Sequence, residues 1–209
     1  IETNRGCPFL CTFCQQGEDY FNSVAMRSTE KVTEELDYIT QRMIKKSPEV
    51  PLLQIADANF AMFKQDLKTT NHIFQMQKNS GWPKSIGCST GKNKPGQVID
   101  AVEKVFPNSL IISSSMQSTN PGTLKEVKRS NISLDAYSKV QMEIQSRGLR
   151  SMADVILGLP HETKSSHFDA LFSLIDSGVQ EFTSYQAMVL KSTELEEDLS
   201  IEKYGLKTK

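Results

Sequence analysis

Short apolar runs alternate with longer amphipathic stretches along most of this 209-residue chain. Each long stretch carries apolar residues three and four positions apart, which is typical of a helix with one buried face. Val32, Leu36 and Ile39 are one such set, and Ser28 ahead of them suits a helix cap. Because strands that alternate with helices favour parallel pairing with right-handed crossovers, the alternation predicts an α/β chain.

The sequence predicts about six strand–helix units. The expected strands lie at 1–3, 52–55, 85–88, 110–112, 153–157 and 182–190. The expected helices lie at 28–47, 65–78, 95–105, 121–127, 135–148 and 166–177. Six units are too few for a closed eight-stranded barrel, which leaves an open doubly wound sheet or a partial barrel. In both architectures ligands bind at the carboxyl ends of the strands, so chemistry is expected in the loops that follow them.

Composition excludes several classes of protein. The 24 Lys and Arg against 25 Asp and Glu give a net charge of −1, without the basic excess of a nucleic-acid-binding surface. No apolar run approaches the roughly 18 residues of a membrane span. With no secretory signal visible, we expect a cytoplasmic, reducing location. The chain begins with Ile1, so we interpret it as part of a longer protein. We expect a core domain at 1–190 and a charged tail at 191–209 that either frays or leads out of the domain.

Three of the four cysteines, Cys7, Cys11 and Cys14, crowd into one CxxxCxxC segment after the first expected strand. Such short loops strain disulfide geometry, whereas thiolates bind zinc, copper or iron–sulfur clusters. Structural zinc would need a fourth ligand, and Cys88 and the three histidines are each isolated. A cubane cluster normally takes four cysteines, so three leave one iron open to a small molecule. A zinc knuckle or unligated thiols are the alternatives.

The segment Gly6-Cys7-Pro8-Phe9-Leu10-Cys11-Thr12-Phe13-Cys14, with an aromatic residue before the last cysteine, resembles the cluster loop of the radical SAM enzymes. The preceding Ile1-Glu2-Thr3-Asn4-Arg5 is similar to the first-strand opening of the branch with cobalamin-dependent members and methylthiotransferases. The resemblance implies a partial (β/α)6 TIM-like barrel with parallel strands. It further implies that Cys7, Cys11 and Cys14 hold a 4Fe–4S cluster, that the open iron binds the amino and carboxylate groups of S-adenosylmethionine, and that Phe13 lies near the adenine.

Three further loops resemble cofactor-binding motifs of that family. Asp57-Ala58-Asn59-Phe60 stands where many members carry Gly-Gly-Glu, and it is similar to the variant in cobalamin-dependent members. Asp57 and Asn59 can accept hydrogen bonds from an ammonium group, although an Asx turn is the plainer interpretation.

The stretch Ser113–Ser118 and the following basic residues resemble a Gln-Ser and Leu-Lys-x-x-x-Arg pattern of the same branch. Ser115 and Gln117 fall on one side of an extended chain and could bind ribose hydroxyls, while Arg129 could pair with a carboxylate. An ordinary polar loop and a solvated arginine are the alternatives. Asp154–Thr163 is similar to the family's Gly-x-Ile-x-Gly-x-x-Glu segment, which implies that Ile156 packs on the adenine.

Together these motifs imply a radical SAM enzyme that takes an electron from an external reductant and generates a 5′-deoxyadenosyl radical. A cobalamin-dependent methyltransferase is favoured, with cobalamin held by a domain outside this chain. A methylthiotransferase that modifies transfer RNA or protein is the rival, and a non-enzymatic iron–sulfur or zinc module would bind no S-adenosylmethionine. The sequence names neither a substrate nor a general base.

Overall fold

The computed structural model describes residues 1–207. The chain forms two compact units and passes between them several times along its length. Unit 1 contains residues 1–5, 25–114 and 140–152. Unit 2 contains residues 6–24, 115–139 and the chain from 153 onward.

Unit 1 is built on short strand pairs, most of them parallel. β3 (Leu52–Gln54) pairs in parallel with β4 (Ser85–Gly87), and β5 (Ile112–Ser113) pairs in parallel with the start of β6 (Ser151–Leu157). β1 (Asn4–Arg5) instead pairs antiparallel with β2 (Ala25–Met26). The parallel pairs confirm the α/β prediction. The β1–β2 ribbon was not predicted, because two strands of two residues each carry no readable periodicity.

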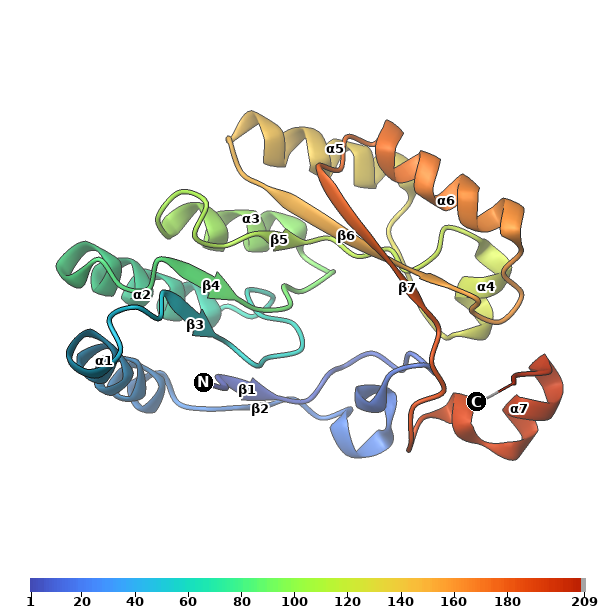
Figure 1. Ribbon diagram of the computed structural model, residues 1–209, viewed down its shortest axis with the longest axis horizontal. Helices are drawn as coiled ribbons and strands as arrows, with labels where there is room; N and C mark the ends of the chain where they lie inside the picture. The colour runs from blue at the N-terminus through green and yellow to red at the C-terminus, as the bar shows by residue number, and fades with distance from the viewer. Residues whose placement is uncertain (208–209) are drawn as a thin grey trace. The chain divides into compact units, whose positions relative to one another are not determined.

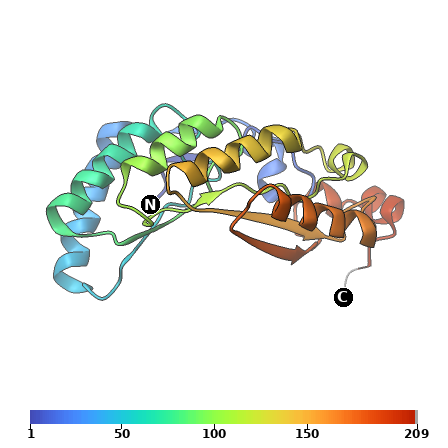
Figure 2. The same ribbon diagram turned by 90° about the horizontal axis from the view of Figure 1, so that it is seen from above.

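Three helices of unit 1 lie beside one another along one side of β3 and β4 (Figures 1 and 2). They are α1 (Thr29–Lys46), α2 (Asp66–Ser80) and α3 (Pro95–Lys104). Ser28 caps α1 as predicted, because its side chain accepts a hydrogen bond from the backbone N–H of Lys31. The helices and strands share one apolar core, which includes Val32, Leu36, Leu53, Ile73, Ile86, Val98 and Ile144. Ile144 comes from α5 (Leu134–Ser146), whose second half belongs to this unit.

Unit 2 contains the rest of β6, which is bonded to β7 (Glu181–Gln186), and the helix α6 (Lys164–Asp176) that runs beside them (Figure 1). A capping box between Thr163 and Ser166 starts α6. A small core of Met116, Tyr137, Ala153, Val155 and Leu174 holds the unit together. α4 (Pro121–Glu126) and the short helices η1 (Gln15–Gly17) and η2 (Asp19–Phe21) complete its first part.

Fraying, one of the two alternatives for the charged tail, does not describe residues 194–196 and 198–204. They form η3 (Glu194–Glu196) and α7 (Asp198–Tyr204). Leu195 is buried, and its backbone N–H donates to the carbonyl of Thr12. Lys203 and Tyr204 both bind the carboxylate of Glu126 at 2.7 Å. The domain boundary at residue 190 stays a prediction. Within the described part of the chain, no helix is long and apolar enough to span a membrane.

Candidate cluster and cofactor site

The cysteine loop, residues 7–14, follows directly on β1 and is folded back by a glycine. Gly6 has a φ of +110°, a conformation that side chains rarely adopt. A Cβ at this position would stand 2.6 Å from the carbonyl oxygen of Ser23 and 2.7 Å from that of Phe21. Cys7, the next residue, donates its backbone N–H to the same Phe21 carbonyl at 2.8 Å. Gly6 therefore allows the chain to turn closely against residues 21–23 and present Cys7.

A second glycine closes the other end of the loop. A Cβ on Gly17 would stand 2.3 Å from the carbonyl oxygen of Cys11. Backbone hydrogen bonds link Cys14 to Cys11 at 3.0 Å and Gly17 to Cys14 at 2.8 Å. These backbone contacts hold residues 11–17 together as one compact turn.

The three thiols lie close enough together to influence one another. Cys7 and Cys11 are buried, and Cys14 is partly buried. Burial raises the pKa of Cys14, and the negative charges of Cys11 and Cys7 raise it further. Among residues 1–207, no three His, Cys, Asp or Glu side chains are arranged around a single metal ion. A cubane spreads its cysteines over different iron atoms, so the soft thiolate set of this loop suits an iron–sulfur cluster.

Arg129, for which a carboxylate partner and a solvated surface position were the alternatives, lies at the cysteine loop. Its Nη1 donates to the Sγ of Cys11 at 3.9 Å, its Nη2 to the carbonyl of Ser115 at 2.5 Å, and its Nε to Asn131 at 2.9 Å. Burial lowers the pKa of Arg129, and the charges of the three thiols oppose that effect. The guanidinium therefore links the cysteine loop to the segment after β5.

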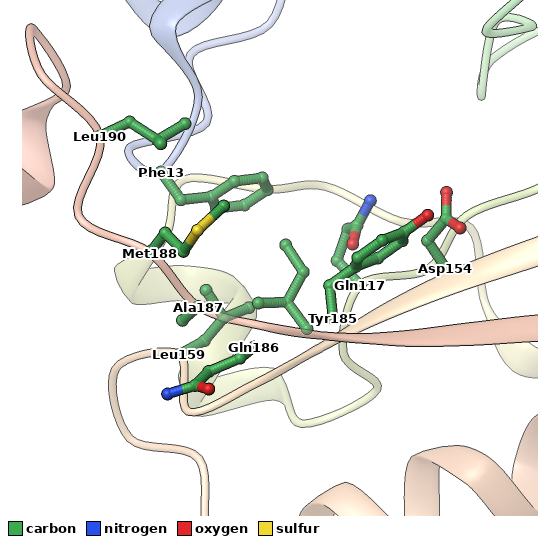
Figure 3. A pocket seen from close by; sticks show the side chains of 10 residues that line it. Phe13, Gln117, Asp154, Leu159, Tyr185, Gln186, Ala187, Met188 and Leu190 are labelled. Atoms are coloured by element: carbon green, nitrogen blue, oxygen red, sulfur yellow. The ribbon is translucent and has the colours of Figure 1, made fainter.

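A cavity of about 220 Å³ in unit 2 is lined by three of the predicted residues, Phe13, Gln117 and Ile156 (Figure 3). Figure 3 shows the ring of Phe13 and the side chain of Met188 at one end of the cavity, and Tyr185 with Gln117 at the other. The lining is mostly apolar. The structure thus gathers residues from the cysteine loop, the segment after β5 and strand β6 around one space.

Two polar groups of this lining are buried without a hydrogen-bond partner in the described chain, the Oε1 of Gln117 and the Oδ1 of Asp154. Gln117 is placed by its backbone, which has a φ of +64° and is bonded to Asp154 and Ile156 of β6. Buried acceptors without a partner cost free energy, so an ordered water or a ligand is expected to satisfy them. Asp154 was not predicted as a site residue. The available signal was its position two residues before Ile156, on the same face of a strand.

Ser115 does not line the cavity, although we predicted a contact with ribose. Its hydroxyl donates to the Oδ2 of Asp154 at 2.5 Å, and its carbonyl accepts from Arg129. Ser115 therefore holds the cavity residue Asp154 in place. The carboxylate of Glu162 accepts hydrogen bonds from the backbone N–H of Gly158 at 3.0 Å and from the hydroxyl of Ser118 at 3.1 Å. Glu162 therefore links the loop after β6 to the segment after β5.

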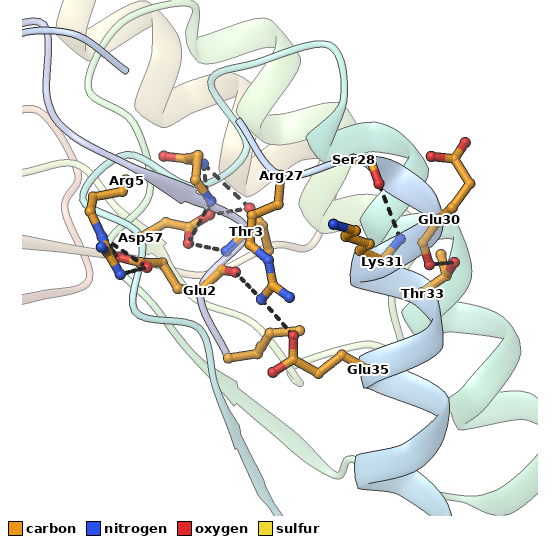
Figure 4. Close-up of polar contacts among 12 residues, drawn as sticks. Glu2, Thr3, Arg5, Arg27, Ser28, Glu30, Lys31, Thr33, Glu35 and Asp57 are labelled. Carbon is orange, nitrogen blue, oxygen red and sulfur yellow. Dashed lines mark hydrogen bonds and ion pairs between the residues drawn. The ribbon is translucent and has the colours of Figure 1, made fainter. Parts of the chain in front are cut away.

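Asp57 and Asn59 belong to unit 1, where Asp57 is buried and bonded to β1 (Figure 4). Its Oδ1 accepts from the backbone N–H groups of Thr3 at 2.7 Å and Asn4 at 3.3 Å. Its Oδ2 accepts from the Asn4 amide at 2.8 Å and from the Thr3 hydroxyl. Burial raises the pKa of Asp57, and the bonds from Thr3 and Asn4 counteract it. Four donors thus occupy the carboxylate, and its contact with an ammonium group stays a prediction, as does that of Asn59.

Comparison with known proteins gives relatives over nearly the whole chain. A cobalamin-dependent radical SAM methyltransferase, TokK of Streptomyces tokunonensis, is 31% identical over 99% of this chain and 30% of its own length. The 2-(S-pantetheinyl)-carbapenam-3-carboxylate methyltransferase of Streptantibioticus cattleyicolor is 30% identical over the same shares. No family model matches the chain. The chain spans about 30% of the length of these relatives.

A solved structure of the radical S-adenosylmethionine methyltransferase TsrM from Kitasatospora setae, with cobalamin and a 4Fe–4S cluster bound, matches with a TM-score of 0.73. The match covers 97% of this chain and 36% of that chain at 12% identity. This likeness confirms the predicted fold class, a partial TIM-like barrel. The sequence similarity to TokK relates the chain to the cobalamin-dependent radical SAM methyltransferases.

Proposed function

We propose that the chain is the radical SAM core of a cobalamin-dependent methyltransferase. The observation that carries the proposal is the position of Phe13. It stands between two of the three clustered cysteines, and its ring lines the cavity that Gln117 and Ile156 also line. A ligand in this cavity would therefore lie next to the cysteine loop, which is what the reductive cleavage of S-adenosylmethionine requires.

Each residue has a separate task in this proposal. Cys7, Cys11 and Cys14 hold a 4Fe–4S cluster, which supplies the electron that splits S-adenosylmethionine. Phe13 and Ile156 pack against the adenine and exclude water from it.

Polar groups then fix the ribose. Gln117 and Asp154 accept hydrogen bonds from its hydroxyls, which would satisfy the two orphaned oxygens. The hydroxyl of Ser115 donates a hydrogen bond to the Oδ2 of Asp154 and fixes the orientation of its carboxylate. An apolar cavity with a few convergent polar groups is the usual form of a nucleoside site.

The activity of the whole protein goes beyond this chain. Relatives of which it spans 30% are named as methyltransferases, and we propose methyl transfer with cobalamin bound outside this chain. An external reductant in the cytoplasm would supply the electron. A methylthiotransferase and a non-enzymatic metal module are both less well supported, because neither class is found among the relatives at 30% identity or above.

The test is anaerobic reconstitution with iron and sulfide, followed by equilibrium dialysis with labelled S-adenosylmethionine. Cys11→Ala is expected to abolish iron uptake, whereas Cys88→Ala is expected to retain it. Phe13→Ala is expected to raise the dissociation constant at least tenfold, whereas Phe172→Ala, at a ring that is 59% exposed, leaves it unchanged. Equal affinity in both phenylalanine variants would contradict the assignment of the cavity.

A further inference from the structure

Arg129 donates a hydrogen bond to a thiol of the cysteine loop, from its Nη1 to the Sγ of Cys11. Its side chain is partly buried and is held at three atoms. Asn131, which accepts from the Nε, is itself fixed by its amide to the carbonyls of Met116 at 2.6 Å and Ser118 at 3.2 Å. The guanidinium is therefore rigidly placed, and one of its donors points at the Sγ of Cys11.

A fixed positive charge beside a cluster has a defined electrochemical effect. One-electron reduction makes a cluster more negative, so a nearby cation and an N–H···S hydrogen bond stabilise the reduced form. Arginine retains its charge throughout the physiological pH range. Its partial burial reduces the screening by water that would weaken the same charge at the surface.

We propose that Arg129 is a positioning residue that raises the reduction potential of the cluster and couples it to the nucleoside cavity. The coupling runs through the same side chain, because its Nη2 binds the Ser115 carbonyl while the Ser115 hydroxyl binds Asp154 of the cavity. The contacts with Asn131, Cys11 and Ser115 use three of the five guanidinium N–H groups. This inference rests on the proposed function and goes beyond it, because it gives the Arg129 guanidinium an electrochemical effect on the cluster.

The experiment measures the midpoint potential of the reconstituted chain by EPR at poised potentials. Arg129→Met removes the charge and the hydrogen bonds, and Arg129→Lys keeps the charge. Lys128→Met is the matched control, because the adjacent Lys128 is 52% exposed and pairs with Glu194 at the surface. We expect Arg129→Met to disfavour reduction at least tenfold, which is about 59 mV for one electron. Lys128→Met should match the wild type, and Arg129→Lys should fall between.

The outcomes separate this inference from the proposed function. A wild-type chain that takes up no cluster overturns both. A wild-type cluster with equal midpoints in Arg129→Met and Lys128→Met overturns the inference alone. If circular dichroism shows that Arg129→Met does not fold, Arg129→Lys decides. A midpoint potential within about 59 mV of the wild type supports the charge effect, and a larger drop overturns it.

Discussion

Asp57 offers the sharpest test of how unit 1 holds the strand that leads into the cysteine loop. Its carboxylate accepts four hydrogen bonds from Thr3 and Asn4, two of them from backbone N–H groups. The substitutions Asp57→Ala and Asp57→Asn separate hydrogen bonding from charge. Alanine removes every acceptor, whereas asparagine keeps one carbonyl and the shape of the side chain.

The magnitudes follow from the donors that each variant leaves unpaired. A buried donor without a partner costs about 1–3 kcal/mol, and Asp57→Ala orphans the two backbone N–H groups as well as the Asn4 amide. Relief of a buried charge offsets part of this, so we expect a net cost of about 2–4 kcal/mol. Asp57→Asn should cost less than about 1 kcal/mol. Its carbonyl can serve the backbone donors, and its amide can face the Oδ1 of Asn4, which is buried and has no partner in the described residues.

Urea unfolding followed by circular dichroism measures both variants, read as a shift of the midpoint at constant slope. Asp100→Ala is the control, because Asp100 is 57% exposed and its ion pair with Arg147 contributes at most about 1 kcal/mol. The reasoning is refuted if Asp57→Ala costs no more than Asp100→Ala, or if Asp57→Asn costs as much as Asp57→Ala. Dialysis with S-adenosylmethionine on the stable Asp57→Asn variant then tests the ammonium contact: unchanged affinity means that Asp57 acts only on β1.

Three shorter predictions concern the same segments. Burial raises the pKa of Asp66 from 3.8 to about 7, so the folded chain retains a proton that the unfolded chain loses. Wild-type stability should therefore fall by up to about 4 kcal/mol from pH 4 to 7 relative to Asp66→Asn, and parallel pH profiles of unfolding would contradict this. Gly6→Ala should destabilise by at least about 2 kcal/mol in urea, whereas Gly96→Ala, whose Cβ meets nothing within 4 Å, should not destabilise; equal midpoints would disprove the close turn. Burial raises the pKa of Cys88 to about 12, so iodoacetamide at pH 8 should leave it unlabelled until urea is added, as mass spectrometry can show.

Much of unit 1 could be predicted because its signals are local. The cap at Ser28, the apolar spacing of α1 and the proline that opens α3 each act within a few residues. The two short helices of the tail were not predicted, for the opposite reason. Its composition is charged, but Lys203 and Tyr204 find Glu126, which lies 77 and 78 positions earlier in the chain. Pairing across such a separation leaves no local pattern.

In the candidate site too, local sequence patterns were predictable and contacts between distant residues were not. Spacing alone singled out the three cysteines, and the resemblance singled out Phe13, Gln117 and Ile156, which the structure places around one cavity. The partner of Arg129 could not be predicted, because Cys11 lies 118 positions away and only the fold brings them together. The hydroxyl of Ser115 donates to Asp154, a contact that the sequence did not predict, and its binding of ribose stays a prediction. Residue type indicated which side chains could bind a ligand, and tertiary contacts decided which of them line the cavity.

The central claim is that the cysteine loop carries a cluster whose open iron binds S-adenosylmethionine. The most direct measurement is EPR of the reconstituted, reduced chain, with and without S-adenosylmethionine. The account predicts a 4Fe–4S signal that changes when S-adenosylmethionine is added and that is lost in Cys11→Ala. Zinc binding with no iron uptake, or a cluster signal that does not respond to S-adenosylmethionine, would contradict it.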